Sequence, residues 1–195
     1  MKKKKIDISK FRKFKTLTAA SIFSLGVSVG FFWEEFVGIG IWQSHDILTK
    51  SYNVCFTPPS GCARLLAKEI YKAERSIYVQ AFDFTSDIIA NSLIDAQNRG
   101  IKVEILVDRM SKNSSHSKVT AFKNAGIKVL VDKVSGLAHN KVMILDNKKV
   151  ITGSYNFTNG ADNRNAENVM LIEDKFVSEA YYKNWKNRRA VSEEL

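Results

Sequence analysis

The chain has 195 residues, of which 45% are hydrophobic, so it can bury the core of one ordinary α/β domain plus an extension. Its formal net charge of +10 points to nucleic acid or an anionic membrane as a partner. Eight cations and one acid in residues 1–15 account for +7 of that charge, which leaves +3 for the remainder. The net charge therefore describes the N-terminal segment more than the domain.

An uncharged stretch, TLTAASIFSLGVSVGFFW at residues 16–33, follows the basic run directly. A charged segment before an apolar one is typical of a secretory signal, and Ser28-Val29-Gly30 offers a small-x-small cleavage site. The same residues are marginally long enough to span a bilayer as an uncleaved anchor. We therefore predict an exported protein, secreted or anchored on the periplasmic side of the envelope, with residues 1–33 as signal peptide or anchor.

The two cysteines, Cys55 and Cys62, flank the segment CFTPPSGC. In an exported protein, an even pair around a Pro-Pro turn predicts a disulfide, and two reduced thiols are the alternative. A structural zinc site would need more ligands than two cysteines. His45 and His116 lie apart from them in the sequence, so we predict no metal and no cofactor.

We interpret residues 34–53 as a linker and residues 54–195 as the domain, in which helical and strand patterns alternate. The first expected elements are a helix at 62–74, a strand at 76–84, a helix at 86–100, a strand at 101–108, a helix at 114–126 and a strand at 127–132. Ser86 is the expected N-cap of the second helix, and Gly100 and Gly126 are expected to end helices. Strands that alternate with helices favour parallel pairing.

The pattern changes in the C-terminal third of the chain. LAHNKVMILD (137–146) and KKVITGS (148–154) are joined by a tight polar turn at Asn147, which predicts an antiparallel hairpin. A strand at 166–174 and a closing helix at 174–190 follow. The expected buried side of that helix consists of Phe176, Val177, Ala180, Tyr181 and Trp185. The predicted fold class is α/β, with a mixed, largely parallel sheet and helices on both faces.

The hairpin carries the residues that suggest chemistry. Because side chains on a strand alternate between faces, His139 and Lys141 share one face of the first strand. Across the turn, Gly153 permits close backbone approach, and Ser154 and Asn156 can donate hydrogen bonds. An imidazole, an ammonium and oriented donors suit a phosphoryl group, with the histidine as nucleophile or acid/base.

The string H-x-K-x4-D-x6-G-S, here His139, Lys141, Asp146, Gly153 and Ser154, resembles the signature of the phospholipase D superfamily. The resemblance runs from CFTPPSGC to the last helix. It is closest to the short single-motif branch, which comprises bacterial endonuclease-like members and small exported phospholipases D of intracellular bacteria. It implies a phospholipase D-like fold and a phosphodiester hydrolase.

The resemblance also implies a role for each matching residue. His139 would attack phosphorus and form a phosphohistidine intermediate. Lys141, Ser154 and Asn156 would hold the nonbridging oxygens. Glu167, in NAENV, matches the carboxylate that orients the histidine ring.

Asp146 belongs to the signature but receives a different interpretation. Strand alternation places it on the face opposite His139 and next to the turn. We expect it to be structural, as a turn-capping and ion-pairing residue.

The implied mechanism needs two histidines, whereas the chain holds one complete motif. His116-Ser117-Lys118 is a second H-x-K, but Lys123 replaces the aspartate and no Gly-Ser follows, so it reads as a helix start. A twofold homodimer that brings two copies of His139 together would complete the site at its interface.

Three functions stay open from the sequence. The first is a phospholipase D that releases choline from phosphatidylcholine and leaves phosphatidate, which the predicted export and the nearest resemblance favour. The second is a metal-independent endonuclease that cleaves DNA or RNA, which the endonuclease-like branch and the residual positive charge favour, although +3 is modest for a nucleic-acid groove. The third is a noncatalytic, envelope-anchored binder of nucleic acid or lipid, which would be expected to lack His139 or Lys141. The aromatic residues Tyr78, Phe82, Phe84 and Trp185 read as core or interface residues.

Overall fold

The computed structural model describes residues 51–59, 61–112 and 116–195. The predicted signal or anchor, residues 1–33, and most of the predicted linker lie outside the described residues. The first strand begins at Ser51, three residues before the expected start of the domain at Val54. Residues 51–53 therefore belong to the domain, because they pair with a strand more than a hundred residues away that local patterns do not reveal.

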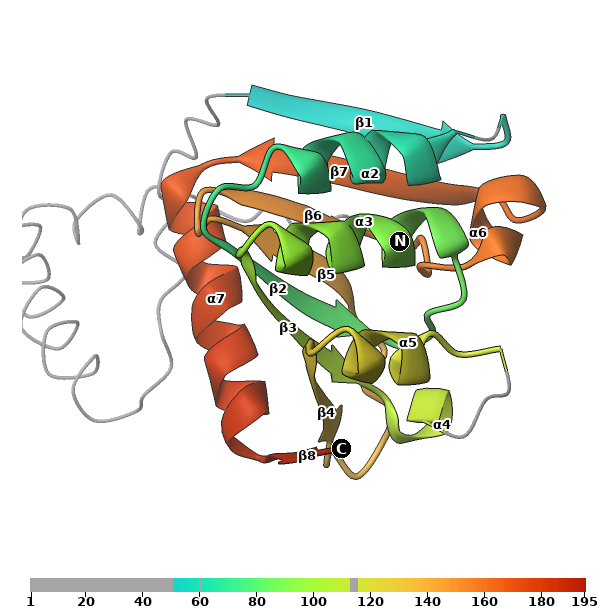
Figure 1. The fold of residues 1–195 in the computed structure, drawn as a ribbon. Helices are drawn as coiled ribbons and strands as arrows, with labels where there is room; N and C mark the ends of the chain where they lie inside the picture. The colour runs from blue at the N-terminus through green and yellow to red at the C-terminus, as the bar shows by residue number, and fades with distance from the viewer. Residues whose placement is uncertain (1–50, 60, 113–115) are drawn as a thin grey trace, which may run out of the picture. The chain divides into compact units, whose positions relative to one another are not determined.

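Helices and strands alternate along the first part of the chain and strands dominate the later part (Figure 1). The elements are β1 (Ser51–Thr57), α2 (Cys62–Tyr71), β2 (Ser76–Ala81), α3 (Asp87–Asn98), β3 (Lys102–Val107), α4 (Arg109–Lys112), α5 (Val119–Asn124), β4 (Lys128–Asp132), β5 (Lys141–Leu145), β6 (Lys149–Gly153), α6 (Asn159–Asn163), β7 (Glu167–Glu173), α7 (Lys175–Ala190) and β8 (Ser192–Glu194). The sequence did not predict β1, β8, α4 or α6.

One sheet contains all these strands in the order β1-β7-β6-β5-β2-β3-β4-β8. The fold class is mixed α/β, as predicted, but parallel pairing is confined to β2–β3 and β3–β4. The other neighbours run antiparallel. Parallel pairing is thus less extensive than predicted, since only the helical crossovers α3 and α5 separate strands by enough chain to return them in the same direction.

Helix boundaries depend on caps that the sequence partly revealed. Ser86 accepts a hydrogen bond from the Ile89 amide at the start of α3, as predicted. Gly100 has a φ of 88° in the left-handed region, which ends that helix without strain. The helix expected at 114–126 is shorter than predicted, because α5 begins at Val119 and Lys118 is its cap residue.

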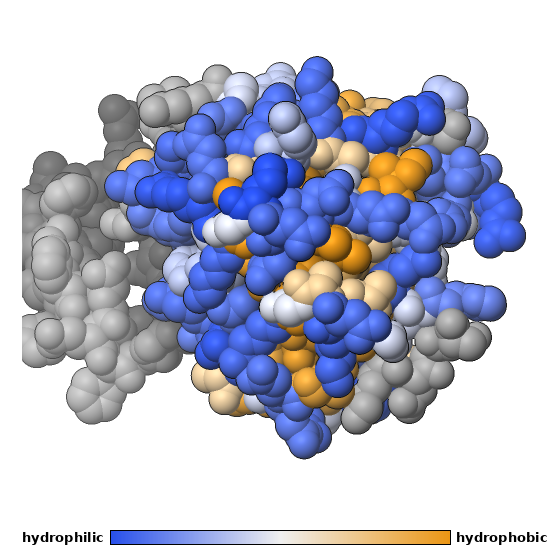
Figure 2. Space-filling view, viewed as in Figure 1, coloured by the Kyte–Doolittle hydropathy of each residue, from blue (hydrophilic) through white to orange (hydrophobic). Residues whose placement is uncertain are grey.

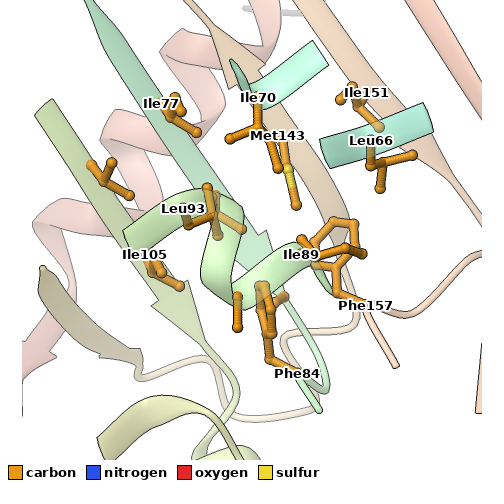
Figure 3. Packing of buried hydrophobic residues seen from close by; sticks show 14 of the residues in the cluster. Leu66, Ile70, Ile77, Phe84, Ile89, Leu93, Ile105, Met143, Ile151 and Phe157 are labelled. Carbon is orange, nitrogen blue, oxygen red and sulfur yellow. The ribbon is translucent and has the colours of Figure 1, made fainter. Parts of the chain in front are cut away.

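Two hydrophobic clusters hold helices against the two faces of the sheet. On one face, α2 contributes Leu66 and Ile70 and α3 contributes Ile89 and Leu93, which pack over the strands (Figure 3). On the other face, the Trp185 ring of α7 lies 4.6 Å from the Tyr78 ring. The molecular surface over α2 and α3 is mostly hydrophilic, and apolar residues are visible between the helices (Figure 2).

The predicted buried side of the last helix is only partly correct. Trp185 is 2% exposed and donates a hydrogen bond to the Val79 carbonyl oxygen at 3.2 Å. Phe176 is 69% exposed and Ala180 is also exposed, whereas Ser178 is fully buried. The helix meets the sheet along a narrower stripe than its apolar residues suggest.

The chain from residue 47 onward forms a compact unit. Both hydrophobic clusters and every strand pairing described above lie within it. The structure joins Cys55 and Cys62 by a disulfide, with their Cα atoms 5.8 Å apart. Among the described residues, no helix combines the length and apolar character needed to cross a membrane.

Candidate active site

The candidate site lies at one edge of the sheet, where two strands begin and two strands end. Lys141 is the first residue of β5, Gly153 the last of β6 and Glu167 the first of β7. Because these strands run antiparallel to their neighbours, these three ends meet. Lys141 also pairs with Ala81, at the end of β2. The fold thus gathers residues that the sequence separates by as many as 86 positions.

His139 and Lys141 differ sharply in their exposure to solvent. The His139 side chain is exposed, and its ring lies 4.5 Å from the ring of Phe82. Lys141 is only 7% exposed, and its Nζ donates a hydrogen bond of 2.8 Å to the His139 carbonyl oxygen. The ammonium also lies 5.1 Å from the centre of the Phe82 ring. The histidine is open to a substrate, and the cation beside it is held rigidly.

Burial lowers the pKa of Lys141 below the usual value of lysine, and the attraction of Glu167 opposes this shift. A charge that has lost water interacts more strongly with a nearby anion than a solvated charge does. Lys141 is therefore suited to attract a phosphoryl oxygen at this edge of the sheet.

Ser154 and Glu167 are directly bonded. The Ser154 hydroxyl donates to Glu167 Oε2 at 2.5 Å and accepts from the Asn168 backbone amide at 3.1 Å. Asn165 Nδ2 donates to the other carboxylate oxygen of Glu167 at 3.0 Å. The carboxylate therefore orients Ser154, whereas the resemblance implies that it orients the ring of His139.

The Gly-Ser pair needs its glycine. Gly153 has a φ of 152°, and a Cβ placed there would meet the Asn168 carbonyl oxygen at 2.2 Å. That carbonyl oxygen accepts a hydrogen bond from the Ser154 amide at 3.1 Å. Any larger residue would push β7 away and displace Ser154.

Asn156 lies near the site in the segment that follows Ser154. Its Oδ1 atom is buried and has no hydrogen-bond partner among the described residues. An unpaired buried amide is costly, so a polar group that pairs with it would be favoured. This observation is compatible with the predicted contact to substrate.

Asp146 lies at the opposite end of β5 from the site. Its carboxylate accepts hydrogen bonds from the amides of Glu74, Arg75 and Ser76 at 3.0, 2.7 and 2.9 Å. Asp146 and Asn147 both have positive φ in the turn between β5 and β6. The interpretation of Asp146 as a turn residue agrees with these contacts, and its place among the catalytic residues of the signature stays a prediction.

Two carboxylates that the sequence did not reveal hold segments next to the site. Asp108 is 1% exposed and accepts hydrogen bonds from the amides of Met110 at 2.8 Å and Ala138 at 2.7 Å, which fixes the loop before His139. Asp162 Oδ1 accepts the Tyr155 hydroxyl at 3.0 Å and the Ala63 amide at 2.9 Å. The sequence signal for Asp108 was a carboxylate directly after a buried strand.

Phe82 is the other residue whose role the sequence did not reveal. It was expected to be a core or interface residue, but it is half-buried and contacts both His139 and Lys141. Its backbone amide also donates to the Asn140 carbonyl oxygen at 3.0 Å. The end of β2 thus serves as a platform for the histidine and the lysine.

The second H-x-K does not form another site. His116 lies in a turn, and Lys118 caps α5 and forms an ion pair with Asp87. Within the described ranges, no group of three or more His, Cys, Asp or Glu side chains is arranged to hold a metal ion.

Comparisons with known proteins agree with this geometry. A family model described as "Cardiolipin synthase, PLD-like domain" matches residues 66–188, which is more than half of the chain. A protein of Rickettsia felis named phospholipase D is 51% identical over 145 residues, which cover 74% of this chain and 72% of that protein. Mitochondrial cardiolipin hydrolase of Xenopus tropicalis is 30% identical over 127 residues, covering 65% of this chain and 60% of that protein.

A solved structure shows the same fold. The crystal structure of Nuc, a phospholipase D family member from Salmonella typhimurium, matches with a TM-score of 0.71 and 31% identity, over 74% of this chain and 97% of that chain. The edge of the sheet described above carries the His-x-Lys and Gly-Ser pairs that first suggested this family. The chain belongs to the phospholipase D superfamily and is a phosphodiesterase of the phospholipase D type.

Proposed function

We propose that this protein is a phospholipase D that hydrolyses phosphatidylcholine to phosphatidate and choline. The observation that carries the proposal is the pairing of an exposed His139 with a buried Lys141 at one edge of the sheet. Over 145 residues the chain is 51% identical to a rickettsial protein named phospholipase D, which supports it. The reaction would proceed without a metal, through a phosphohistidine intermediate.

In the first step, a ring nitrogen of His139 attacks phosphorus and forms an N–P bond, while the P–O bond to choline breaks. The buried ammonium of Lys141 stabilises the charge on the nonbridging oxygens, and the hydroxyl of Ser154 contributes once it turns its proton from Glu167 to the phosphate. In the second step, water attacks phosphorus, and the N–P bond breaks to release phosphatidate.

An acid must protonate the leaving choline oxygen, and a base must later take a proton from water. His139 is the one histidine that the described fold places at this edge, since His116 precedes α5 in a separate turn. We propose that His139 of a second copy fills this role in a homodimer whose twofold axis passes the site. The exposure of His139 in the single chain leaves its ring accessible to such a partner.

The test uses the compact unit, residues 47–195, with phosphatidylcholine vesicles in the presence of EDTA. Wild type is compared with His139→Ala and with the matched control His116→Ala, which removes the other exposed histidine of the unit. Choline release that disappears in His139→Ala and persists in His116→Ala supports the proposal. No choline release from wild type, together with cleavage of single-stranded DNA, would assign the site to a nuclease instead.

The dimer is tested separately by sedimentation of the same unit. A mass of about twice the monomer is expected. Adding an excess of inactive His139→Ala to wild type should lower the activity per wild-type chain, because each mixed dimer keeps one of the two histidines that the reaction needs. A stable monomer with full activity would refute the shared site.

A further inference from the structure

Four apolar side chains form an exposed stripe on β1 and β7, which we call the apolar stripe: Tyr52, Val54, Phe56 and Met170. Their exposed fractions are 72, 37, 62 and 40%. The three members on β1 alternate along the strand, so they share one face, and Val54 pairs directly with Met170 on β7. The stripe is therefore one continuous surface.

This surface is unusual for its position in the sheet. β1 is one of the two edge strands of the sheet, and in the described part of the chain it pairs only with β7. Exposed apolar side chains on an edge strand favour aggregation, and edge strands commonly carry charged residues or proline instead. The opposite face of β1 is used for packing, since Cys55 lies against the main cluster and Thr57 is buried. An apolar outer face at this edge indicates a partner.

One end of the stripe reaches the candidate active site. Phe56 pairs with Asn168 across the two strands, and the Asn168 amide donates to the hydroxyl of Ser154 at 3.1 Å. The next pair is Thr57 with Glu167, whose carboxylate accepts the Ser154 proton. A surface on which the stripe rested would therefore lie beside the site.

The sequence before β1 indicates what kind of surface the apolar stripe would contact. The uncharged segment at 16–33 ends 17 residues before Ser51, the first residue of β1. If that segment is held in a bilayer, β1 is the element tethered nearest to it. Tyrosine and phenylalanine also suit the boundary between lipid headgroups and acyl chains, because they combine apolar area with a rigid ring.

The alternative partner for this surface is β1 of a second copy of the chain. The strand order of the sheet argues against such a β1–β1 pairing. Strand β5 is three positions from the edge, so edge pairing would hold the two copies of β5 about 34 Å apart, at about 4.8 Å per strand. The two copies of His139 could not then share a site.

We propose that the apolar stripe docks the domain on the surface of a phospholipid bilayer and sets the active site beside the headgroups. The proposal rests on the proposed phospholipase function, because it supplies the lipid surface on which that activity would occur. It assigns β1 a role in substrate access that is separate from the chemistry at His139.

The experiment measures binding of residues 47–195 to phosphatidylcholine vesicles by co-sedimentation. The stripe variant carries Tyr52→Thr, Val54→Thr and Phe56→Thr, because β-branched threonine suits a strand. The control variant carries Tyr71→Gln, Ile88→Gln and Val191→Thr, at positions that are 72, 42 and 51% exposed elsewhere. We expect at least about tenfold weaker binding of the stripe variant and no change in the control.

Two further readouts separate the explanations. Turnover of a soluble diester, bis(p-nitrophenyl) phosphate, should be the same in the stripe variant and wild type, and vesicle binding should persist in 0.5 M salt because apolar contacts are not screened. Equal vesicle binding by the stripe variant and wild type would overturn the proposal, and so would a loss of binding accompanied by a halved mass. Vesicle binding does not require catalysis, so an inactive wild type that binds through the stripe would refute the proposed function alone.

Discussion

The two ends of the β5–β6 hairpin belong to one sequence signature but have opposite physical character. At the turn end, the carboxylate of Asp146 accepts three backbone amides and its own amide donates to the Ser76 carbonyl oxygen. At the other end, His139 is exposed and the ammonium of Lys141 is buried without a direct carboxylate partner among the described residues. At the turn end the carboxylate is engaged by backbone amides, whereas at the other end the His139 ring stays exposed to solvent.

This difference indicates that the signature residue at the turn stabilises the fold, whereas those at the other end of the hairpin take part in the chemistry. The turn ties the hairpin to the loop before β2, which fixes the register of β5 against its neighbours. With the register fixed, the far ends of β5 and β6 project the histidine, the lysine and the serine to the same edge. Substitutions at the two ends should therefore affect different measurements.

The largest effect is expected for His139→Asn. Loss of the nucleophile should reduce choline release by about 10⁴-fold or more, because the covalent route is removed. The free energy of unfolding should stay within about 0.5 kcal/mol of wild type, because the side chain is exposed. Steady-state choline release and urea denaturation of the same preparation check both parts. Residual activity within tenfold of wild type would exclude His139 as the nucleophile.

Lys141→Met should reduce kcat by about 10²- to 10³-fold, as loss of one group that stabilises transition-state charge commonly does. The lowered pKa of Lys141 means that the ammonium loses its proton at lower pH than an ordinary lysine. Activity that needs this charge is complete below the folded-state pKa and falls as the pH rises through it. The pH–rate profile of wild type should show this alkaline decline.

The sign for stability is the reverse of the sign for activity. A lowered lysine pKa makes the charged form unfavourable in the folded state, so wild type should gain stability as the pH rises through that pKa. Urea midpoints of Lys141→Met should lack this alkaline gain. A variant that is less stable than wild type at every pH would show that the ammonium stabilises the fold.

Asp146→Asn should change stability and leave the chemistry intact. Burial acts to raise the pKa of Asp146, but hydrogen bonds from the amides of Ser76, Glu74 and Arg75 outweigh it and hold the pKa below the usual value. The stabilisation is present above the ordinary aspartate pKa and is lost as the pH falls through the folded-state pKa. We expect a loss of about 1–3 kcal/mol at neutral pH, with kcat unchanged under folding conditions.

Denaturation curves at neutral and acidic pH test this assignment. The difference between wild type and Asp146→Asn should shrink as the pH falls, because wild type becomes protonated there too. A large loss of kcat in a fully folded variant would instead place Asp146 in the catalytic chemistry.

The smallest effect is expected for Tyr155→Phe. The Tyr155 hydroxyl donates to Asp162, and burial together with this carboxylate raises the pKa of the tyrosine. Removal of the hydroxyl should cost about 0.5–1.5 kcal/mol, since Asp162 keeps the Ala63 amide as a partner. Activity should fall less than tenfold, because Ser154 keeps its bonds to Glu167 and Asn168. Thermal unfolding and choline release measure the two effects.

Local patterns in the sequence were enough to predict the short-range features of this protein. Alternation and spacing predicted the hairpin, the shared face of His139 and Lys141, and the structural role of Asp146, because side-chain direction in a strand follows from its period of two residues. Ser86 and Gly100 marked the ends of α3 because capping depends on residues within one helical turn. These interactions span a few positions and can be read from the chain.

Contacts between residues far apart in the chain could not be predicted and became visible in the folded sheet. It paired β1 with β7, placed Phe82 against His139, and gave Glu167 to Ser154. It also limited parallel pairing to three strands and left Phe176 exposed. These contacts depend on the register and order of strands that are far apart in the chain. The same local sequence patterns would fit many different strand orders equally well. Their energies arise from burial and pairing in the folded sheet, so no local pattern encodes them.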